Sequence, residues 1–275
     1  MAAGVGEAVA VIGDNTIDQY VGQDSYSFVG GNALNVAVQM VRLGRPARYF
    51  GAVGPDHAGQ RIRDTLARLG VDVAGLVSMA GRTSVSRIRI DESGDRHFEF
   101  EDFGVCADYA PGIEALELAA ECQAAHIGLL PLARPVRAWL ARRGVLISQD
   151  CGVTKGYEHL DIAFCSQAAA GEPAEKIAQD AVAGGARLAI VTCGADGSLA
   201  FDGRTWWRES AVPVETVDTT GAGDSYSAGF LDARLAGADV GQAMKAGSAH
   251  AARTCTHIGA WLQDPLPVPG PTADR

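Results

Sequence analysis

The residues best suited to chemistry lie in the segment 217–231, whose sequence is VDTTGAGDSYSAGFL. We expect a strand over 214–217, a turn of small residues over 219–223 and a helix over 224–235. The first turn of a helix has unpaired N–H groups and carries the positive end of the helix dipole. A strand, a glycine-rich turn and a helix in that order therefore predict an anion site that suits phosphate.

Asp224 is the residue that needs an explanation at such a site. Its carboxylate would repel a bound phosphate, unless it accepts the proton of a hydroxyl group that attacks the phosphorus. Aspartate is also common at helix starts, and an isolated Gly-x-Gly-Asp would favour that role. The longer string DTTGAGD at 218–224 favours the general base.

Two segments resemble the signatures of the ribokinase-like (PfkB) carbohydrate kinases. The string at 218–224 resembles their C-terminal signature, and GGNALN at 30–35 resembles their N-terminal one. Order and spacing agree from Val11 to about Trp261. The resemblance implies an α/β fold, a Rossmann-like three-layer sandwich with a mainly parallel sheet and a small antiparallel β-flap lid. It also implies transfer of the γ-phosphate of ATP to a primary hydroxyl of a sugar, with Mg²⁺ as cofactor.

The same resemblance implies roles for individual residues. In the catalytic centre these are the base, Asp224, and the backbone N–H groups of an anion hole, at Gly221, Ala222 and Gly223. The implied sugar contacts are Asp18, Gly30, Gly31 and Asn35. A carboxylate suits this task because it accepts hydrogen bonds from two neighbouring hydroxyls. Asp14 either contacts the sugar as well or only shapes the turn after the first strand.

The nucleotide and cation sites are less sharply defined by the sequence. The resemblance implies nucleotide contacts from Thr192, Gly194, Gly197 and Thr220, although 196–197 is also an ordinary turn sequence. It implies that Asp218 and Thr220 help to hold K⁺ through carbonyl oxygens. Relatives often carry Asn-x-x-Glu for Mg²⁺, where this chain has Ser-Gln-Ala-Ala at 166–169. Glu172 is close enough to substitute, or it is only an acid at a helix start.

The acceptor is indicated by likeness to one subgroup, the fructosamine kinases. The similar strings are IGDN at 12–15, GGNALNVAV at 30–38, VCAD at 105–108 and HIGAW at 257–261. This likeness implies phosphorylation of the 6-hydroxyl of fructoselysine or a related fructosamine. Other sugar or nucleoside kinases (ribose, fructose, 2-keto-3-deoxygluconate) and a non-catalytic sensor on the same fold stay open. A dinucleotide-binding Gly-x-Gly-x-x-Gly does not follow the first strand, and no Gly-Lys pair exists for a Walker loop.

The elements that must position these residues follow a βα rhythm, which predicts parallel strands joined by right-handed crossovers. We expect strands at 8–13, 49–53, 71–77, 125–129, 145–149, 162–165 and 188–192. We expect helices at 30–43, 57–69, 112–122, 135–142, 173–183, 224–235 and 240–255. An alternating pattern over 84–90 and 96–101 predicts a hairpin with one apolar face.

This pattern predicts a single domain over 1–275, with the lid formed by about 14–30 and 84–102. The tail after Trp261 is rich in proline and is expected to be a loose end. An apolar face of the hairpin, formed by Val85, Ile88, Ile90 and Phe98, would suit a homodimer or would pack on its own domain.

Composition limits the partners. The chain has 275 residues, 33 acidic against 23 basic, and a formal net charge of −10. This charge argues against nucleic acid and anionic membrane surfaces. No apolar run approaches the roughly 18 residues of a membrane span, and no secretory signal is readable. Six scattered cysteines without a Cys-x-x-Cys pair favour free thiols in the cytoplasm.

Overall fold

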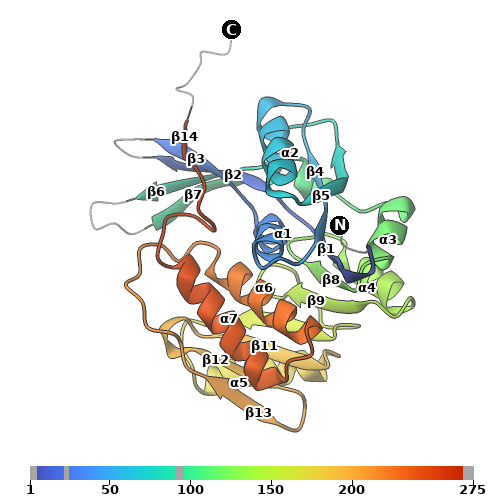
Figure 1. The fold of residues 1–275 in the computed structure, drawn as a ribbon, viewed down its shortest axis with the longest axis vertical. Coiled ribbons are helices and arrows are strands. Elements are labelled where there is room, and N and C mark those ends of the chain that lie inside the picture. Colours follow the sequence, from blue (N-terminus) through green and yellow to red (C-terminus); the bar gives the residue numbers. More distant parts are fainter. Residues whose placement is uncertain (1–4, 22–24, 91–95, 269–275) are drawn as a thin grey trace.

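A computed structural model of the chain describes residues 5–21, 25–90 and 96–268. It has two β-sheets of unequal size, and helices cover the larger one (Figure 1). None of the helices in these ranges is long and apolar enough to cross a membrane.

The larger sheet has nine strands in the order β13-β12-β11-β10-β9-β8-β1-β4-β5. Its strands are β1 (Val9–Ile12), β4 (Ala47–Val53), β5 (Asp72–Ser78), β8 (Ala124–Ile127), β9 (Leu146–Asp150), β10 (Ile162–Ser166), β11 (Leu188–Thr192), β12 (Ser198–Phe201) and β13 (Trp206–Glu209). All neighbours pair in parallel except at the edge formed by β11, β12 and β13, which is antiparallel.

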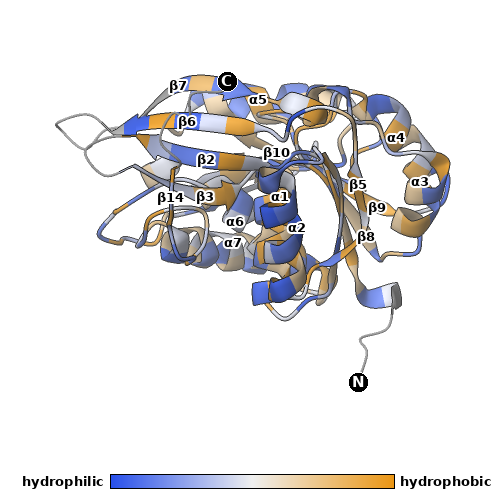
Figure 2. Cartoon of the chain, turned by 90° about the horizontal axis from the view of Figure 1, so that it is seen from above, coloured by the Kyte–Doolittle hydropathy of each residue, from blue (hydrophilic) through white to orange (hydrophobic). Residues whose placement is uncertain are grey.

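The smaller sheet has five strands in the order β14-β3-β2-β6-β7. They are β2 (Thr16–Val21), β3 (Tyr26–Gly30), β6 (Val85–Ile90), β7 (Arg96–Asp102) and β14 (Leu266–Pro267). Only β2 and β6 pair in parallel. Figure 2 shows this sheet extending to one side of the body formed by the larger sheet and its helices.

Seven α-helices complete the described chain, with 3₁₀ turns at Val5–Glu7, Gly104–Asp108 and Gly194–Asp196. They are α1 (Asn32–Arg42), α2 (His57–Leu69), α3 (Ile113–Ala120), α4 (Ala133–Ala141), α5 (Glu172–Ala183), α6 (Ala222–Leu235) and α7 (Val240–Thr254).

Strand β1 explains the layering. Its four residues are completely buried; Val9 and Val11 belong to the core shared with α1, α2, α6 and α7, and Ala10 and Ile12 to the core shared with α3, α4 and α5. Successive side chains of a strand point to opposite faces, so an uninterrupted apolar run fits a strand covered by helices on both sides. The expected three-layer α/β sandwich with a second, smaller sheet is thereby confirmed.

Most expected helices and strands agree with the structure to within two residues at each end. The expected strand over 214–217 is wrong. The N–H of Val217 donates to the carbonyl of Cys255 at 2.8 Å instead of to a neighbouring strand. Because Val214 and Val217 are 38% and 52% exposed, their apolar character does not report burial in a sheet.

The tail after Trp261 also differs from expectation. Leu266 and Pro267 form β14 against β3. The side chain of Gln263 accepts from the N–H of Val29 at 3.0 Å and donates to its carbonyl at 2.9 Å. These bonds between residues 234 positions apart tie the tail to the smaller sheet, which no local pattern could reveal.

The four residues of the expected apolar hairpin face do not share one exposed face. Register shifts between Arg87 and Ile88, and Ile88 is 1% exposed against Tyr20 and Phe28. Val85 packs against the core of the larger sheet. The side chains of Ile90 and Phe98 lie outside the described part of the structure.

Candidate functional site

A cleft of about 750 Å³ lies between the smaller sheet and the carboxyl ends of the central strands of the larger one. Ligands of open α/β sheets bind at this edge, because loops from neighbouring strands converge there. Side chains from β2, β6, β7, α1 and the start of α6 line it, together with the loop before α6. We call this space the cleft.

Asp224 lies in the first turn of α6, is 8% exposed, and is held by two asparagines of α1. The amide of Asn32 donates to its Oδ1 and that of Asn35 to its Oδ2, both at 2.7 Å. Asn32 also donates to Oδ2 of Asp150, at the end of β9, at 2.7 Å. Asn32 and Asn35 are three residues apart, so one helix face presents both amides to the same carboxylate.

Asp14 and Gly31 set the start of α1. The two carboxylate oxygens of Asp14 accept the N–H groups of Asn32 and Ala33 at 2.9 and 3.0 Å. Gly31 has φ 116°, and a Cβ there would lie 2.5 Å from the Cα of Asn15. The carboxylate of Asp14 is therefore engaged by the N–H groups at the start of α1, so Asp14 both lines the cleft and shapes the turn. The close approach of Gly31 to Asn15 requires glycine at position 31.

Asp18 lies in a row of polar side chains across the smaller sheet. Asp18 of β2 is opposite Ser86 of β6, and Ser86 is opposite Glu101 of β7. All three line the cleft. A Cβ at Gly30 would collide with Oδ2 of Asp18, so glycine at 30 makes room for this carboxylate.

The loop before α6 forms the other wall of the cleft. Oδ1 of Asp218 accepts the N–H of Thr220 at 2.8 Å, and Oδ2 accepts the N–H of Gly259 at 2.7 Å. Gly221 has φ 73°, and a Cβ there would collide with Ala260. Asp218 thus stabilises the loop through backbone amides, and Thr220 lies beside it at the cleft.

The three amides expected in the anion hole are not equivalent. The N–H of Ala222 donates to the carbonyl of Thr219 at 3.1 Å, so it is already engaged. A Cβ at Gly223 would meet open space, which leaves room for a ligand at the first turn of α6. The amides of Gly221 and Gly223 are therefore better candidates for the anion hole than the amide of Ala222.

Seven predicted residues are absent from the cleft lining. Gly30, Ala222 and Gly223 adjoin lining residues in the chain, and the other four do not. Thr192 ends β11, Gly194 lies in the 3₁₀ turn after it, and Gly197 follows that turn. A Cβ at Gly197 would collide with the carbonyl of Glu209, so packing already accounts for this glycine. Glu172 is exposed at the start of α5, which fits its alternative role as a helix-start acid.

Sequence reasoning missed two members of the Asp224 network. Asn32 lies in the GGNALN segment at 30–35, but no contact was predicted for it. Its position three residues before Asn35 on one helix could have indicated that both amides reach the same group. Asp150 is the acid that ends an apolar strand, and carboxyl ends of parallel strands meet at one edge of a sheet. Its partnership with Asn32, 118 positions away, had no local signal.

The cleft is strongly acidic. Asp14, Asp18, Glu101, Asp218 and Asp224 line it, and no Lys, Arg or His does so among the described residues. Burial raises the pKa of Asp224 well above its ordinary value, and the neighbouring carboxylates Asp150, Asp14 and Asp18 raise it further, whereas the bond from Asn35 lowers it. Burial, reinforced by nearby carboxylates, raises the pKa of Asp18 to about 7. A carboxylate with a raised pKa is suited to accept a proton near neutral pH.

The donor set decides what metal this edge can hold. Within the described residues no three His, Cys, Asp or Glu side chains cluster as metal ligands. Mg²⁺ in phosphate-transferring sites is held by one or two carboxylates together with substrate phosphates. Asp150, which accepts from the amide of Asn32 at the end of β9, supplies a carboxylate of that kind, so the residues fit a metal that arrives with the nucleotide.

Comparisons with known proteins agree with this geometry. Residues 5–139 and 157–267 match the family described as pfkB family carbohydrate kinase. The chain is 36% identical to the fructoselysine 6-kinase of Escherichia coli (strain K12), over 93% of this chain and 100% of that protein. It is 28% identical to a fructosamine kinase of Bacillus subtilis (strain 168), over 91% of each. The Arabidopsis thaliana ribokinase complexed with ribose and ATP superposes with a TM-score of 0.84 at 20% identity, over 92% of this chain and 94% of that one.

Proposed function

The chain belongs to the pfkB family of carbohydrate kinases and is an ATP-dependent sugar kinase, and from this premise we propose that its acceptor is the 6-hydroxyl of fructoselysine or a related fructosamine. Two relatives that the chain matches over more than nine-tenths of its length are named for these acceptors. The acidic cleft is a second support, because a fructosamine carries an amine that is protonated at neutral pH. Negative side chains in a cleft raise the local concentration of such a cation.

The observation that carries the catalytic proposal is the carboxylate of Asp224, fixed by two amide donors at 2.7 Å. Asp224 accepts the proton of the 6-hydroxyl as that oxygen attacks the γ-phosphorus of ATP. Asn32 and Asn35 hold the carboxylate in one orientation, so it needs no rearrangement before the proton moves. The amides of Gly221 and Gly223 face the negative charge that develops on the transferred group.

The remaining groups hold the two substrates. Asp18, with Gly30 at the end of β3 and Gly31 at the start of α1, holds the sugar from the side of the smaller sheet. Thr192, Gly194 and Gly197 follow a strand at the edge where nucleotides bind in α/β folds, and they with Thr220 are assigned to ATP. Mg²⁺ bound with the phosphates would neutralise charge near Asp150 and Asp224. The smaller sheet acts as the lid that excludes water and limits hydrolysis of ATP.

Three further assignments accompany this function. K⁺ is assigned to carbonyl oxygens of the loop around Asp218 and Thr220, and a higher kcat in KCl than in NaCl tests it. The cytoplasm is the assigned location, since ATP is supplied there and four of the six cysteine thiols are buried and unpaired. A homodimer is assigned to the outer face of the lid, where Phe100 is 52% exposed. Phe100→Ser should then yield a monomer in light scattering.

The acceptor is tested by a coupled ADP-release assay with ribose, fructose, 2-keto-3-deoxygluconate, nucleosides and fructoselysine. We expect the highest kcat/KM with fructoselysine, and a product that carries phosphate on the 6-hydroxyl. A higher kcat/KM with any of the other acceptors would contradict the proposed acceptor and leave the kinase chemistry intact. Absence of turnover with every acceptor would favour a non-catalytic sensor.

A further inference from the structure

A second space of about 500 Å³ opens beside the cleft, next to the carboxyl ends of β8 and β9. We call it the side hollow. Phe103, Leu129 and Val153 line both spaces, so the two adjoin at these three side chains. The mechanism above makes no use of the side hollow, although an acceptor in the cleft would lie directly against it.

The side hollow carries the opposite charge from the cleft. Arg134 and Lys155 line it, and among the described residues no carboxylate does. Lys155 is exposed and forms no ion pair with any described residue, whereas Lys176 pairs with Asp180 at 3.0 Å. Arg134 is 77% exposed, and its Nε lies 3.7 Å from Oε1 of Glu158. An exposed pair at that distance contributes little free energy, but it places the guanidinium beside Glu158.

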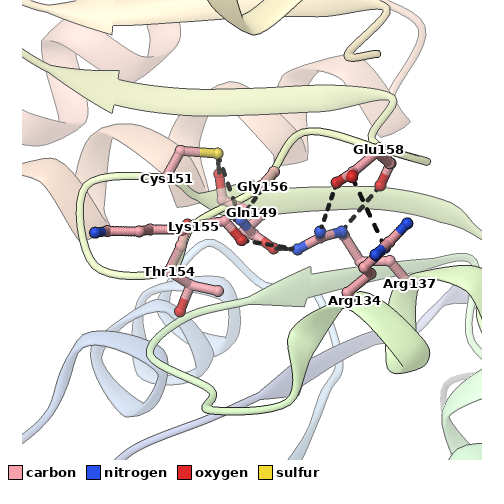
Figure 3. A network of polar contacts seen from close by, with 8 residues as sticks. All are labelled: Arg134, Arg137, Gln149, Cys151, Thr154, Lys155, Gly156 and Glu158. Atoms are coloured by element: carbon pink, nitrogen blue, oxygen red, sulfur yellow. Dashed lines mark hydrogen bonds and ion pairs between the residues drawn. The ribbon is translucent and has the colours of Figure 1, made fainter. Parts of the chain in front are cut away.

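Lys155 stands on a loop that is firmly held. The hydroxyl of Thr154 donates to the carbonyl of Gly128 at 2.7 Å and accepts the N–H of Leu130 at 3.0 Å. The completely buried Arg137 donates to Oε1 of Gln149 at 2.5 Å and to the carbonyl of Glu158 at 2.9 Å. Figure 3 shows the contacts of Arg137 and Gln149 with this loop, and the side chains of Lys155 and Arg134 extending to opposite sides of them. The ammonium group is therefore presented from a fixed backbone.

We propose that the side hollow is the subsite for a tail on the acceptor sugar that ends in a carboxylate, and that Lys155 binds this carboxylate. This inference rests on the proposed function, because the amino-acid part of fructoselysine supplies such a tail. With the 6-hydroxyl at Asp224, the other end of the sugar points toward the shared apolar side chains. Methylene groups of the tail pack on Phe103, Leu129 and Val153, and the carboxylate reaches Lys155 beyond them.

The distribution of charge gives this arrangement its selectivity. The amine at the sugar end lies on the acidic side, near Asp18 and Glu101, and the carboxylate lies on the basic side. A tail that ends in an ammonium group with no carboxylate beside it would meet Lys155 as a like charge. The two spaces together thus distinguish an amino-acid conjugate from a simple sugar and from a sugar linked to a diamine.

The test compares fructoselysine with its carboxamide, in which only the tail carboxylate is neutralised. For the unaltered enzyme we expect a KM for the carboxamide that is higher by roughly tenfold, with kcat changed by less than twofold. Lys155→Met should raise KM for fructoselysine by roughly fivefold to tenfold and leave KM for the carboxamide unchanged. Lys155→Glu should raise KM for fructoselysine further. The matched control is Lys176→Met, which removes a lysine at a distance from both spaces.

The outcomes separate this inference from the function on which it rests. If both fructosamines are phosphorylated and Lys155→Met changes neither KM, or changes both equally, the subsite assignment is overturned while the proposed acceptor stands. If the unaltered enzyme phosphorylates neither fructosamine but accepts another sugar, both the proposed acceptor and the subsite assignment are contradicted. Thermal unfolding of each variant controls for folding, and an exposed lysine is expected to leave the melting temperature unchanged.

Discussion

The cleft and the side hollow adjoin at three apolar side chains, yet they are built in opposite ways. In the cleft, buried carboxylates are crowded together and are held by amide groups of the protein itself. In the side hollow, two basic side chains reach out from a fixed loop and a helix start. Crowded burial changes the protonation of carboxylates, which suits proton transfer, whereas exposed basic side chains stay accessible to a ligand, which suits recognition. The comparison teaches that catalysis and selectivity can be separated by burial as well as by position.

The largest effect is expected from Asp224→Asn, which removes the proposed base from the cleft. We expect kcat to fall by about 10³-fold, because a positioned general base typically contributes about 10²–10⁴-fold. Binding of ATP, measured by calorimetry, should persist. Asp180→Asn, on the surface of α5, is the matched control and should leave kcat unchanged. A kcat for Asp224→Asn within tenfold of the unaltered enzyme would remove Asp224 from its role.

A smaller effect is expected from Asn35→Ala, which tests whether the amides tune the carboxylate. The bond from Asn35 lowers the pKa of Asp224, so its loss should raise a pKa that burial already raises. At pH 7 more of Asp224 is then protonated, and kcat should fall by roughly tenfold to 100-fold and recover in part as pH rises to 9. The pH–rate profile is the measurement.

The control for that profile is Gln39→Ala, four residues and about one turn further along α1. Its amide donates to the carbonyl of Ala260 at 2.6 Å and does not contact Asp224. This variant should lose stability without moving the profile. If both variants leave the profile in place, Asn35 does not tune the base.

Arg137→Met tests the support of the side hollow. It leaves Gln149 and the carbonyl of Glu158 without their buried donor, so we expect the free energy of unfolding to fall by about 2–4 kcal/mol. Chemical denaturation measures this loss, and KM for fructoselysine should rise because the loop of Lys155 loosens. The pH–rate profile set by Asp224 should stay the same. Arg142→Met, an exposed neighbour on the same segment, should change neither quantity.

The smallest effect is expected from Asp18→Asn, which reduces the acidity of the cleft. The pKa of Asp18 is about 7 in the folded protein, above its ordinary 3.8. Between these values the folded chain holds a proton that the unfolded chain has released, so this group's contribution to stability falls as pH rises from about 4 to about 7. The variant should therefore melt a few degrees higher than the unaltered protein at pH 8, with no such gain at pH 4.

The same substitution predicts a change in acceptor binding. In the unaltered enzyme KM for the acceptor should fall as pH rises through about 7, because Asp18 ionises over that range. Asp18→Asn should remove this dependence and raise KM several-fold at pH 8. A pH dependence of KM that survives in the variant would assign it to another carboxylate of the cleft.

Sequence patterns predicted most of the architecture because buried strands and amphipathic helices have characteristic apolar patterns over a few consecutive residues. The run at 8–13 and the helix His57–Leu69 are examples. Where the local signal was apolar but burial did not follow, prediction failed, as for Val214 and Val217. Where a segment is ordered by a distant partner, as Gln263 is by Val29, no local signal existed at all.

The candidate site divides in the same way. The glycines at 31 and 221, the acid at 224 and the amide at 35 were readable, because close approaches and helix starts restrict residue types within a few positions. The link from Asn32 to both Asp150 and Asp224 was not readable, since it joins three elements across 118 and 192 positions. The excess of acid over base in the whole chain likewise gave no hint that Arg134 and Lys155 line a space beside the acidic cleft.

By itself, then, the amino-acid sequence determined the order of strands and helices, the family and the identity of the proposed base. Only the tertiary structure decided which carboxylates share a space, what their burial does to their pKa values and where the opposite charge lies. The physical reason is the distance along the chain over which each effect acts. Periodicity and backbone restrictions act over a few residues, whereas desolvation and charge pairing depend on whatever the folded chain brings within a few ångströms.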